Sequence, residues 1–326
     1  MMLFRRRFLQ LAAGVAILPA SSRLVRAQTY PTRPVRAIVP FGPGGPTDVT
    51  ARLIAQKLSE HLGKQVYVEN LPGAGSNIGT AQAARAAPDG HTILITVNNY
   101  VINPSLYKKV AYDPAKDFAP VTLAARFASA LTVHPSVPAR TARDLVATIR
   151  ANPGKYSFAS PGLGTPSHLI GEHFRVSQGL DMVHVPFNGS GPATAAVMAG
   201  HVPISFGAVA SAEPFVKDSK LIALAIASKQ RSSALPNTPT MAEAGFPDVE
   251  GDGWIGVLVP AATPKDIVTM LHREIVRVLT QPDIRERLAT LGLDPVGTTP
   301  EEFAALMMVE GEKWAKVIRA ANIQVQ

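Results

Sequence analysis

The sequence predicts an α/β protein of two lobes, in which each lobe is a mostly parallel sheet flanked by helices. Its 326 residues are more than one small hydrophobic core needs. An apolar strand, a turn rich in small residues and a helix follow one another four times, twice in each half of the chain. Strands that alternate with helices in this way form parallel sheets through right-handed crossovers.

Apolar runs and turn residues place the elements of the first half. The predicted strands are residues 35–39, 65–69, 91–97 and 121–133, and the predicted helices are residues 49–62 and 79–85. Residues 98–120 are predicted to be irregular, because their apolar and polar residues follow neither the helix period nor the strand period.

Helix caps order the second half. Thr141, Thr165 and Thr299 each stand where the N-cap of a predicted helix belongs. A further capping pattern at Thr240 predicts a short helix that stops at Gly245. The predicted strands are residues 156–160, 182–186, 202–207, 221–227 and 253–260, and the predicted helices end near residues 151, 176, 199, 280, 291 and 321.

Two strands are expected to connect the lobes. Residues 121–133 lead into the second lobe, and the strand at 253–260 returns the chain to the first. We therefore expect the first lobe to consist of residues 28–128 and 253–326, and the second lobe of residues 129–252.

The first 27 residues are predicted to be a signal peptide that is cleaved after Ala27. Arg5–Arg7 form a basic start, and the apolar run Phe8–Pro19 is too short to span a bilayer as a helix, which disfavours a retained anchor. The pattern Arg-Arg-x-Phe-Leu at residues 5–9 fits twin-arginine export, and the Sec route stays open. The predicted location of the mature protein is the periplasm.

Charge and cysteine content exclude several classes of function. The five arginines of the predicted signal peptide account for much of the basicity, because removing them lowers the formal net charge from +8 to +3. The mature sequence has no dense stripe of Lys and Arg, which disfavours nucleic acid as a partner. There is no cysteine, so disulfides, thiolate chemistry and a lipid-bearing cysteine are all excluded.

The first glycine-rich turn, residues 40–48, is the feature around which the rest is organised. It follows an apolar strand and precedes a helix, which gathers free backbone N–H groups and the positive end of a helix dipole at one point. The turn contains no lysine, and Arg52 lies one helical turn further on. We therefore expect an anion to be held here mainly by backbone donors.

Three further turns have the same character, at residues 70–79, 161–168 and 187–192. One such turn is a structural commonplace, since glycine permits tight turns and Ser, Thr and Asp cap helices. Four of them, two in each half, predict two lobes that point helix N-termini into a shared cleft. Such a cleft suits a small dianion, because the carboxyl ends of parallel strands are where open α/β sheets bind ligands.

Enzymatic alternatives fit the residues poorly. A dinucleotide fingerprint would start at Gly42 and Gly44, but its third glycine position holds Thr47. His168 and His173 are five residues apart and so lie on different faces of a helix, unlike a zinc pair. Gly-x-Ser-x-Gly is absent around the serines of the third turn. We predict no catalytic residue, no metal and no cofactor.

A series of motifs then links the whole mature chain to a known family. In order these are Val-Pro-Phe-Gly-Pro-Gly-Gly-Pro-Thr-Asp at 39–48, Glu-Asn-Leu-Pro-Gly-Ala-Gly at 69–75, Pro-Asp-Gly at 88–90, Pro-Ser-His-Leu at 166–169, His-Val-Pro-Phe at 184–187, and Trp254 with Gly256. The sequence resembles the Bug-type extracytoplasmic solute receptors, which are the substrate-binding proteins of tripartite tricarboxylate transporters.

The resemblance implies a fold and a function. The implied fold is that of a type II periplasmic binding protein, with a hinge at two crossing strands. The implied function is capture of a small carboxylate between the lobes and delivery to the permease subunits of a tripartite transporter in the membrane, by a monomeric receptor that is not an enzyme.

It also implies which residues contact the ligand. In the first lobe these are Phe41, Gly42, Gly44, Gly45, Thr47, Asp48, Gly73, Ala74, Gly75, Ser76 and Asn77. In the second lobe they are Ser160, Gly162, Thr165, Ser167, His168, Asn188, Gly189, Pro192 and Ala193, with Phe206, Gly207 and Ala208 as walls.

Two departures and several alternatives remain. In this chain Ser76 stands where many relatives carry a glycine, and Phe187 stands where many carry a tyrosine. Because phenylalanine has no hydroxyl, this chain lacks one hydrogen-bond donor that those relatives have. Dicarboxylates, tricarboxylates, aromatic acids and acidic amino acids are all compatible ligands. For an amino acid, the hypothesis is that Asp48 pairs with the ligand ammonium. The alternative functions are a carboxylate-sensing subunit and, less well supported, a nucleotide-dependent enzyme.

Overall fold

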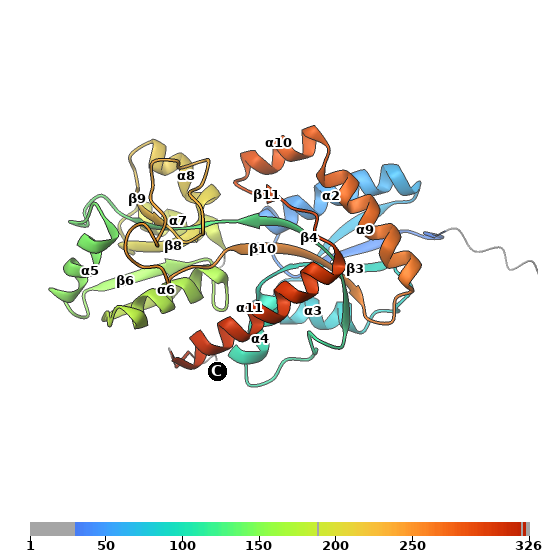
Figure 1. The fold of residues 1–326 in the computed structure, drawn as a ribbon, viewed down its shortest axis with the longest axis horizontal. Coiled ribbons are helices and arrows are strands. Elements are labelled where there is room, and N and C mark those ends of the chain that lie inside the picture. Colours follow the sequence, from blue (N-terminus) through green and yellow to red (C-terminus); the bar gives the residue numbers. More distant parts are fainter. Residues whose placement is uncertain (1–29, 188, 321, 324–326) are drawn as a thin grey trace, which may run out of the picture.

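Two α/β lobes lie side by side and are joined by long strands that run from one to the other (Figure 1). The computed structural model describes residues 30–187, 189–320, 322 and 323, so the predicted signal peptide lies outside the described residues. Each lobe is built on one sheet with helices against it, which confirms the predicted fold class.

The first lobe contains a six-stranded sheet in the order β11-β4-β10-β3-β1-β2. The bounds are β1 Val35–Val39, β2 Val66–Asn70, β3 Thr92–Val97, β4 Phe118–Phe127, β10 Gly253–Pro260 and β11 Asp294–Pro295. Strand β1 runs parallel to β2 and β3, whereas β10 runs antiparallel to β3 and β4.

The second lobe contains a five-stranded sheet in the order β7-β6-β8-β5-β9. The bounds are β5 Ser129–Val133, β6 Tyr156–Ser160, β7 Met182–Pro186, β8 Ile204–Ala208 and β9 Ile222–Ile226. Strand β6 runs parallel to β7 and β8, and β5 runs antiparallel to β8 and β9.

Both sheets are therefore mixed, but most strands of each sheet run in one direction, as predicted: β1, β2, β3 and β4 in the first lobe, and β6, β7, β8 and β9 in the second. The strands that crossover helices connect are parallel, as such connections require. These are β1, β2 and β3 in the first lobe and β6, β7 and β8 in the second. Strand β10 in the first sheet and strand β5 in the second, which carry the chain between the lobes, run in the opposite direction to these strands. Their apolar sequence identifies them as strands but not their direction.

The helices agree with the predicted ones except at three places. The first lobe has α2 Pro46–Leu62, α3 Asn77–Ala84, α4 Asn99–Leu106, α9 Lys265–Leu279, α10 Pro282–Thr290 and α11 Pro300–Ala320, and the second has α5 Ala142–Arg150, α6 Pro166–Ser177, α7 Ser190–Met198 and α8 Val209–Lys217. Helices α4 and α8 were not predicted, and each contains a proline that hides the helical pattern. At Thr240 the capping hydrogen bonds form, but they close only a turn.

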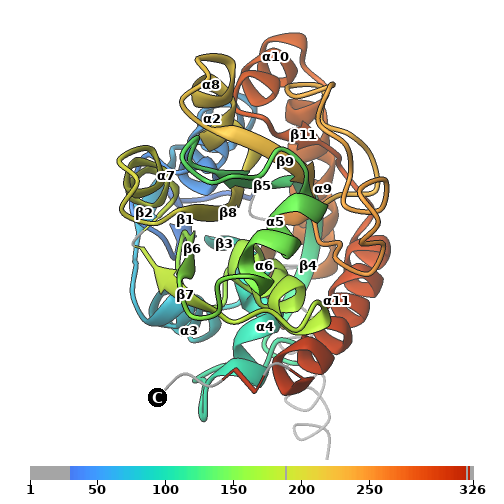
Figure 2. The ribbon, with the colours of Figure 1, turned by 90° about the vertical axis from the view of Figure 1, so that its left-hand side faces the viewer.

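Helix α11 packs against both lobes. Phe303, near its start, is buried in a cluster with Trp254 of the first lobe. Trp314 and Ile318, near its end, are buried in the core cluster of the second lobe. Figures 1 and 2 show the helix running along the side of the molecule from one lobe to the other. The first half of α11 therefore covers the first lobe, and its second half packs against the second lobe.

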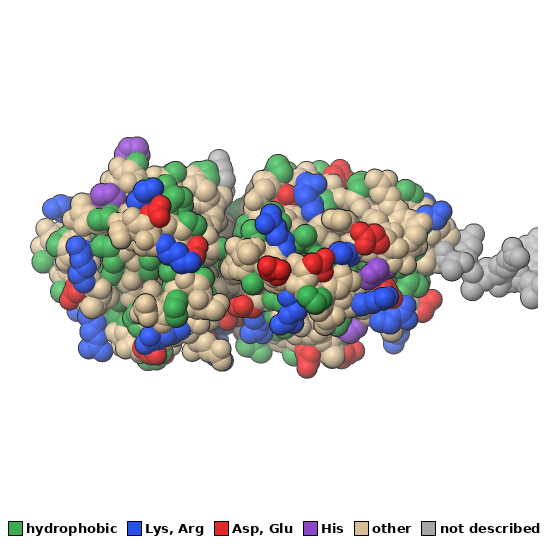
Figure 3. Space-filling model, turned by 90° about the horizontal axis from the view of Figure 1, so that it is seen from above, with side chains coloured by type: hydrophobic (Ala, Val, Ile, Leu, Met, Phe, Trp, Pro, Cys, Tyr) green, Lys and Arg blue, Asp and Glu red, His purple; other side chains and the backbone are tan. Residues whose placement is uncertain are grey.

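Charged side chains of both signs are scattered over the face seen in Figure 3, where the two lobes meet at a narrow waist. Among the described residues, no helix is both long enough and apolar enough to cross a membrane.

Candidate functional site

The first glycine-rich loop, residues 40–48, is anchored by the carboxylate of Asp48. Asp48 is buried, and its two oxygens accept hydrogen bonds from the backbone N–H of Gly44 (2.9 Å) and the side chains of Arg52 (3.0 Å) and Asn70 (2.9 Å). Burial alone would raise the pKa of the Asp48 carboxyl, but these hydrogen bonds and the Arg52 charge lower it below its ordinary value. The Asp48 carboxylate is therefore ionised, and both of its oxygens accept hydrogen bonds from groups of the same chain.

The second loop carries unusual backbone geometry. Gly73, Ala74, Gly75 and Ser76 all have positive φ angles, of 132°, 48°, 61° and 84°. Such angles cost an alanine or serine about 1–3 kcal/mol and persist only where the surroundings enforce them. Strain of this kind concentrates at binding sites, because it presets the direction of backbone N–H groups. Ser76 is one of the strained residues.

Two asparagines of α4 hold this second loop in place. The Asn103 side-chain amide donates to the carbonyl of Gly75 (2.7 Å) and to Oδ1 of Asn77 (2.9 Å), and Asn99 donates more weakly to the same carbonyl (3.4 Å). Both asparagines are almost completely buried, and the Oδ1 atom of each has no hydrogen-bond partner among the described residues. Helix α4 is thus the support of the second loop.

The first and second loops lie side by side because β1 and β2 are neighbouring parallel strands. Asn70, at the end of β2, donates to the Phe41 carbonyl (3.0 Å) as well as to Asp48. The backbone N–H of Leu71 donates to the Val39 carbonyl (2.8 Å). The first N–H groups of α2 have no acceptors in their own helix, as at every helix start. At the start of α3, the N–H groups of Asn77 and Ile78 donate to the carbonyls of Ala74 and Gly73. An anion at this edge would therefore find free donors mainly at the start of α2.

The third and fourth loops form the matching edge of the second lobe. Thr165 caps α6 by accepting from the His168 N–H (3.3 Å), with Pro166 in the first turn, as predicted. The backbone N–H groups of Phe187 and Gly189 donate to the carbonyls of residues 160 and 161 (3.0 and 2.9 Å), which fixes the two loops together.

Two histidines lie beneath the third loop, and burial keeps both neutral. The rings of His168 and His184 stack with centroids 4.0 Å apart. His184 Nε2 forms a 2.7 Å hydrogen bond with Ser160, and His168 Nδ1 accepts the N–H of Gly164 (3.1 Å). Burial lowers the pKa of His184 to about 4 and that of His168 well below its ordinary value. Neither imidazole therefore supplies a positive charge to the loops at neutral pH.

This burial predicts an acid-sensitive fold. The pKa of His184 lies below its unfolded value of about 6.5, so the unfolded chain takes up a proton first as the pH falls. The contribution of neutral His184 to the free energy of unfolding should be fully present above about pH 6.5. It should decline by up to about 1.4 kcal/mol per pH unit as the pH falls to about 4. Urea unfolding of the wild type and His184→Asn between pH 7 and 4 measures the difference, and parallel curves for the two would contradict the prediction.

The third loop touches the first lobe directly. A side chain on Gly164, whose φ is +74°, would meet Leu106, Asn103 and Asn99 of α4, with the nearest atoms 2.7, 3.1 and 3.4 Å away. Helix α4 therefore contacts the second loop on one side and the third loop on the other. The sequence did signal this region, since Asn98-Asn99 directly follows the end of β3, but residues 98–120 were predicted to be irregular.

The predicted ligand contacts differ in exposure. Gly42, Gly44 and Ala74 are exposed at the loop tips, whereas Ser160 is completely buried. The other predicted residues that are buried are Thr47, Asp48, Ser76, Ser167, His168, Ala193, Phe206 and Ala208, and the partly buried ones are Phe41, Gly45, Gly73, Gly75, Asn77, Gly162, Thr165, Gly189 and Gly207. Pro192 is exposed, and Asn188 lies outside the described residues.

Phe206 does not act as a wall through its side chain. Its ring is fully buried and packs against Phe158 and Phe174 in the core of the second lobe. The prediction that its side chain lines the cleft is corrected accordingly, because the side chain lies on the face of β8 that packs against Phe158 and Phe174.

The four loops offer an anion backbone donors rather than side-chain cations. Asp48 is the one formally charged residue in their sequences, at residues 40–48, 70–79, 161–168 and 187–192. Arg52, just beyond the first loop, forms an ion pair with Asp48. An anion bound here would be stabilised by N–H groups and helix dipoles, which carry no net charge that needs compensation in the empty protein.

Comparison with known proteins adds independent findings. Residues 50–323 match the family described as "Tripartite tricarboxylate transporter family receptor". The chain is 40% identical over 317 residues to a UPF0065 protein from the tcbD–tcbE intergenic region of Pseudomonas sp., covering 96% of this chain and 94% of that one. It is 34% identical over 322 residues to protein BugT of Bordetella pertussis, covering 97% and 99%.

Solved structures agree with the fold over their full length. A protein described as a periplasmic transporter is 41% identical, with a TM-score of 0.84 over 91% of this chain and 100% of that one. A Rhodopseudomonas palustris protein solved with adipate is 33% identical, with a TM-score of 0.85 over the same shares. MatC from the same species, solved with malate, is also 33% identical, with a TM-score of 0.81 over 89% and 100%.

Proposed function

Because the chain belongs to the receptor family of tripartite tricarboxylate transporters, we propose that it captures a small carboxylate between its lobes and delivers it to membrane permease subunits. The family consists of solute-binding receptors rather than enzymes. Its solved members include periplasmic proteins, so we also propose export of this chain to the periplasm.

One observation supports the proposal above the others. The second loop, with its strained N–H groups, and the third loop, with its capped helix, both contact α4. Loops from both lobes therefore lie at one place between them. A ligand that contacts both loops would favour the closed arrangement of the lobes, because each contact is complete only there.

The ligand class is proposed from the same geometry. Backbone donors and helix N-termini recognise carboxylates. Relatives that are 33% identical were solved with the dicarboxylates adipate and malate. We propose that this chain binds a carboxylate of that size.

A thermal-shift screen tests the proposal. The mature chain, residues 28–326, would be heated with adipate, malate, citrate, benzoate, aspartate and, as a control, NAD. A carboxylate present at 100 times its dissociation constant should stabilise the protein by about 2.7 kcal/mol and raise the midpoint by a few degrees. A shift with NAD and with no carboxylate would overturn the proposal.

A further inference from the structure

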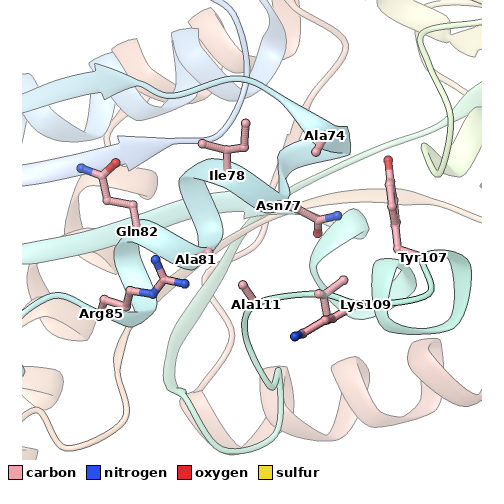
Figure 4. Close-up of a pocket in the computed structure, with 10 residues that line it drawn as sticks. Ala74, Asn77, Ile78, Ala81, Gln82, Arg85, Tyr107, Lys109 and Ala111 are labelled. Atoms are coloured by element: carbon pink, nitrogen blue, oxygen red, sulfur yellow. The ribbon is translucent and has the colours of Figure 1, made fainter. Parts of the chain in front are cut away.

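A surface groove of about 600 Å³ lies against the outer side of α3. One wall is the face of this helix that carries Ile78, Ala81 and Arg85, and the other wall is the segment 107–111 (Figure 4). Most of the lining is apolar, and Ile78 leaves 55% of its side chain exposed. An apolar groove on a solvent-exposed face commonly marks a docking site.

The rim of the groove is positive. Arg85 and Lys109 are exposed on opposite walls, with Ala111 between them in Figure 4. No acidic residue lines the groove, and among the described residues neither cation forms an ion pair. Lys108, next along the chain, is also exposed. A partner that fits this groove would therefore place acidic residues beside an apolar one.

The groove shares residues with the second loop. Ala74 and Asn77 belong to that loop and also line the groove. The hydroxyl of Tyr107, at the end of the groove, lies so close to Gly75 that a Cβ there would be 2.5 Å from it. Any shift of this loop on ligand binding would change the shape of the groove.

We propose that this groove, resting on the proposed receptor function, docks an acidic segment with an apolar anchor from a membrane subunit of the transporter. A protein segment fits better than a small molecule, because small-ligand sites bury most of the ligand surface and this groove is open along one side. An amphipathic helix laid into a groove needs only such a floor and a complementary rim. Linkage through the second loop makes docking depend on whether the receptor is loaded.

The test measures binding of the receptor to transporter membrane subunits in nanodiscs by interferometry. Arg85→Glu with Lys109→Glu should weaken binding at least tenfold, and added salt should weaken the wild type more than this variant. Lys64→Glu with Lys155→Glu is the matched control, because both lysines are exposed, lie outside the groove and give the same change in charge. The control should bind like the wild type.

Two results separate this proposal from the proposed function. If a carboxylate raises the melting midpoint of both double variants equally but both bind the nanodiscs alike, docking at the groove is overturned and ligand capture stands. If no carboxylate raises the midpoint of any of the proteins, ligand capture fails on its own terms. Saturable benzoate binding that only Arg85→Glu with Lys109→Glu abolishes would replace the protein segment by a small molecule and overturn the docking proposal.

Discussion

Replacing Asp48 with asparagine is expected to weaken the binding of every carboxylate by about 30-fold, or roughly 2 kcal/mol. The Asp48 carboxylate receives the Gly44 N–H and the side chains of Arg52 and Asn70. A neutral amide cannot satisfy these donors in the same way, and Arg52 would lose its counter-charge. The first loop would then lose its anchor, and its N–H groups would no longer be fixed for an anion. Isothermal titration with each carboxylate found in the thermal screen measures the loss.

The pattern across ligands decides between two roles for Asp48. As an anchor, it affects all carboxylates to a similar degree. As a direct partner of an ammonium group, it would affect acidic amino acids and leave adipate or malate unchanged, and that result would contradict the anchor role. Asp283→Asn is the matched control. Asp283 lies on α10, is exposed and forms an ion pair with Lys57, which is on α2 like Asp48 but away from the loop. Its binding should equal that of the wild type.

The parts of the fold that depend on local chemistry were predictable from sequence. Glycine and proline turns, apolar strands and threonine caps each act over a few residues, so the strand–turn–helix units were placed correctly. The reversed direction of β5 and β10 was not predictable, because it is set by the path of the chain between lobes. Helix α4 was missed for a related reason, since Pro104 and its polar asparagines suit an irregular segment unless tertiary contacts are known.

The candidate site shows the same division. The four loops follow from residue types at strand ends, and they lie in adjacent pairs, as parallel neighbouring strands dictate. The function of individual side chains did not follow, because their partners are distant in sequence. Asn70 reaches Asp48 across 22 positions, and Asn103 reaches Gly75 across 28. No local pattern announces such contacts.

Replacing Trp314 with alanine is expected to lower the free energy of unfolding by about 3–5 kcal/mol, as for other fully buried large side chains. Trp314 lies in the second-lobe core although its helix begins in the first lobe. Its indole N–H donates to Glu310 (2.7 Å), which also accepts from Asn98 (3.0 Å), and Asn98 in turn accepts the backbone N–H of Trp254 (2.8 Å). The substitution therefore removes packing and one link of a chain that ties α11 to the crossing strand β10.

The same geometry predicts that Trp314→Ala loosens the coupling between the lobes. The family resemblance implied a hinge at two crossing strands, and α11 is a third connection that must bend or slide if the lobes open. Trp254 is the one tryptophan left in the variant, so its fluorescence reports the first lobe while ellipticity reports both. The two transitions in urea should separate in Trp314→Ala and coincide in Trp314→Phe, which keeps most of the volume but loses the N–H. Coincident transitions in both variants, with a loss below about 1 kcal/mol for alanine, would mean that α11 does not hold the lobes together.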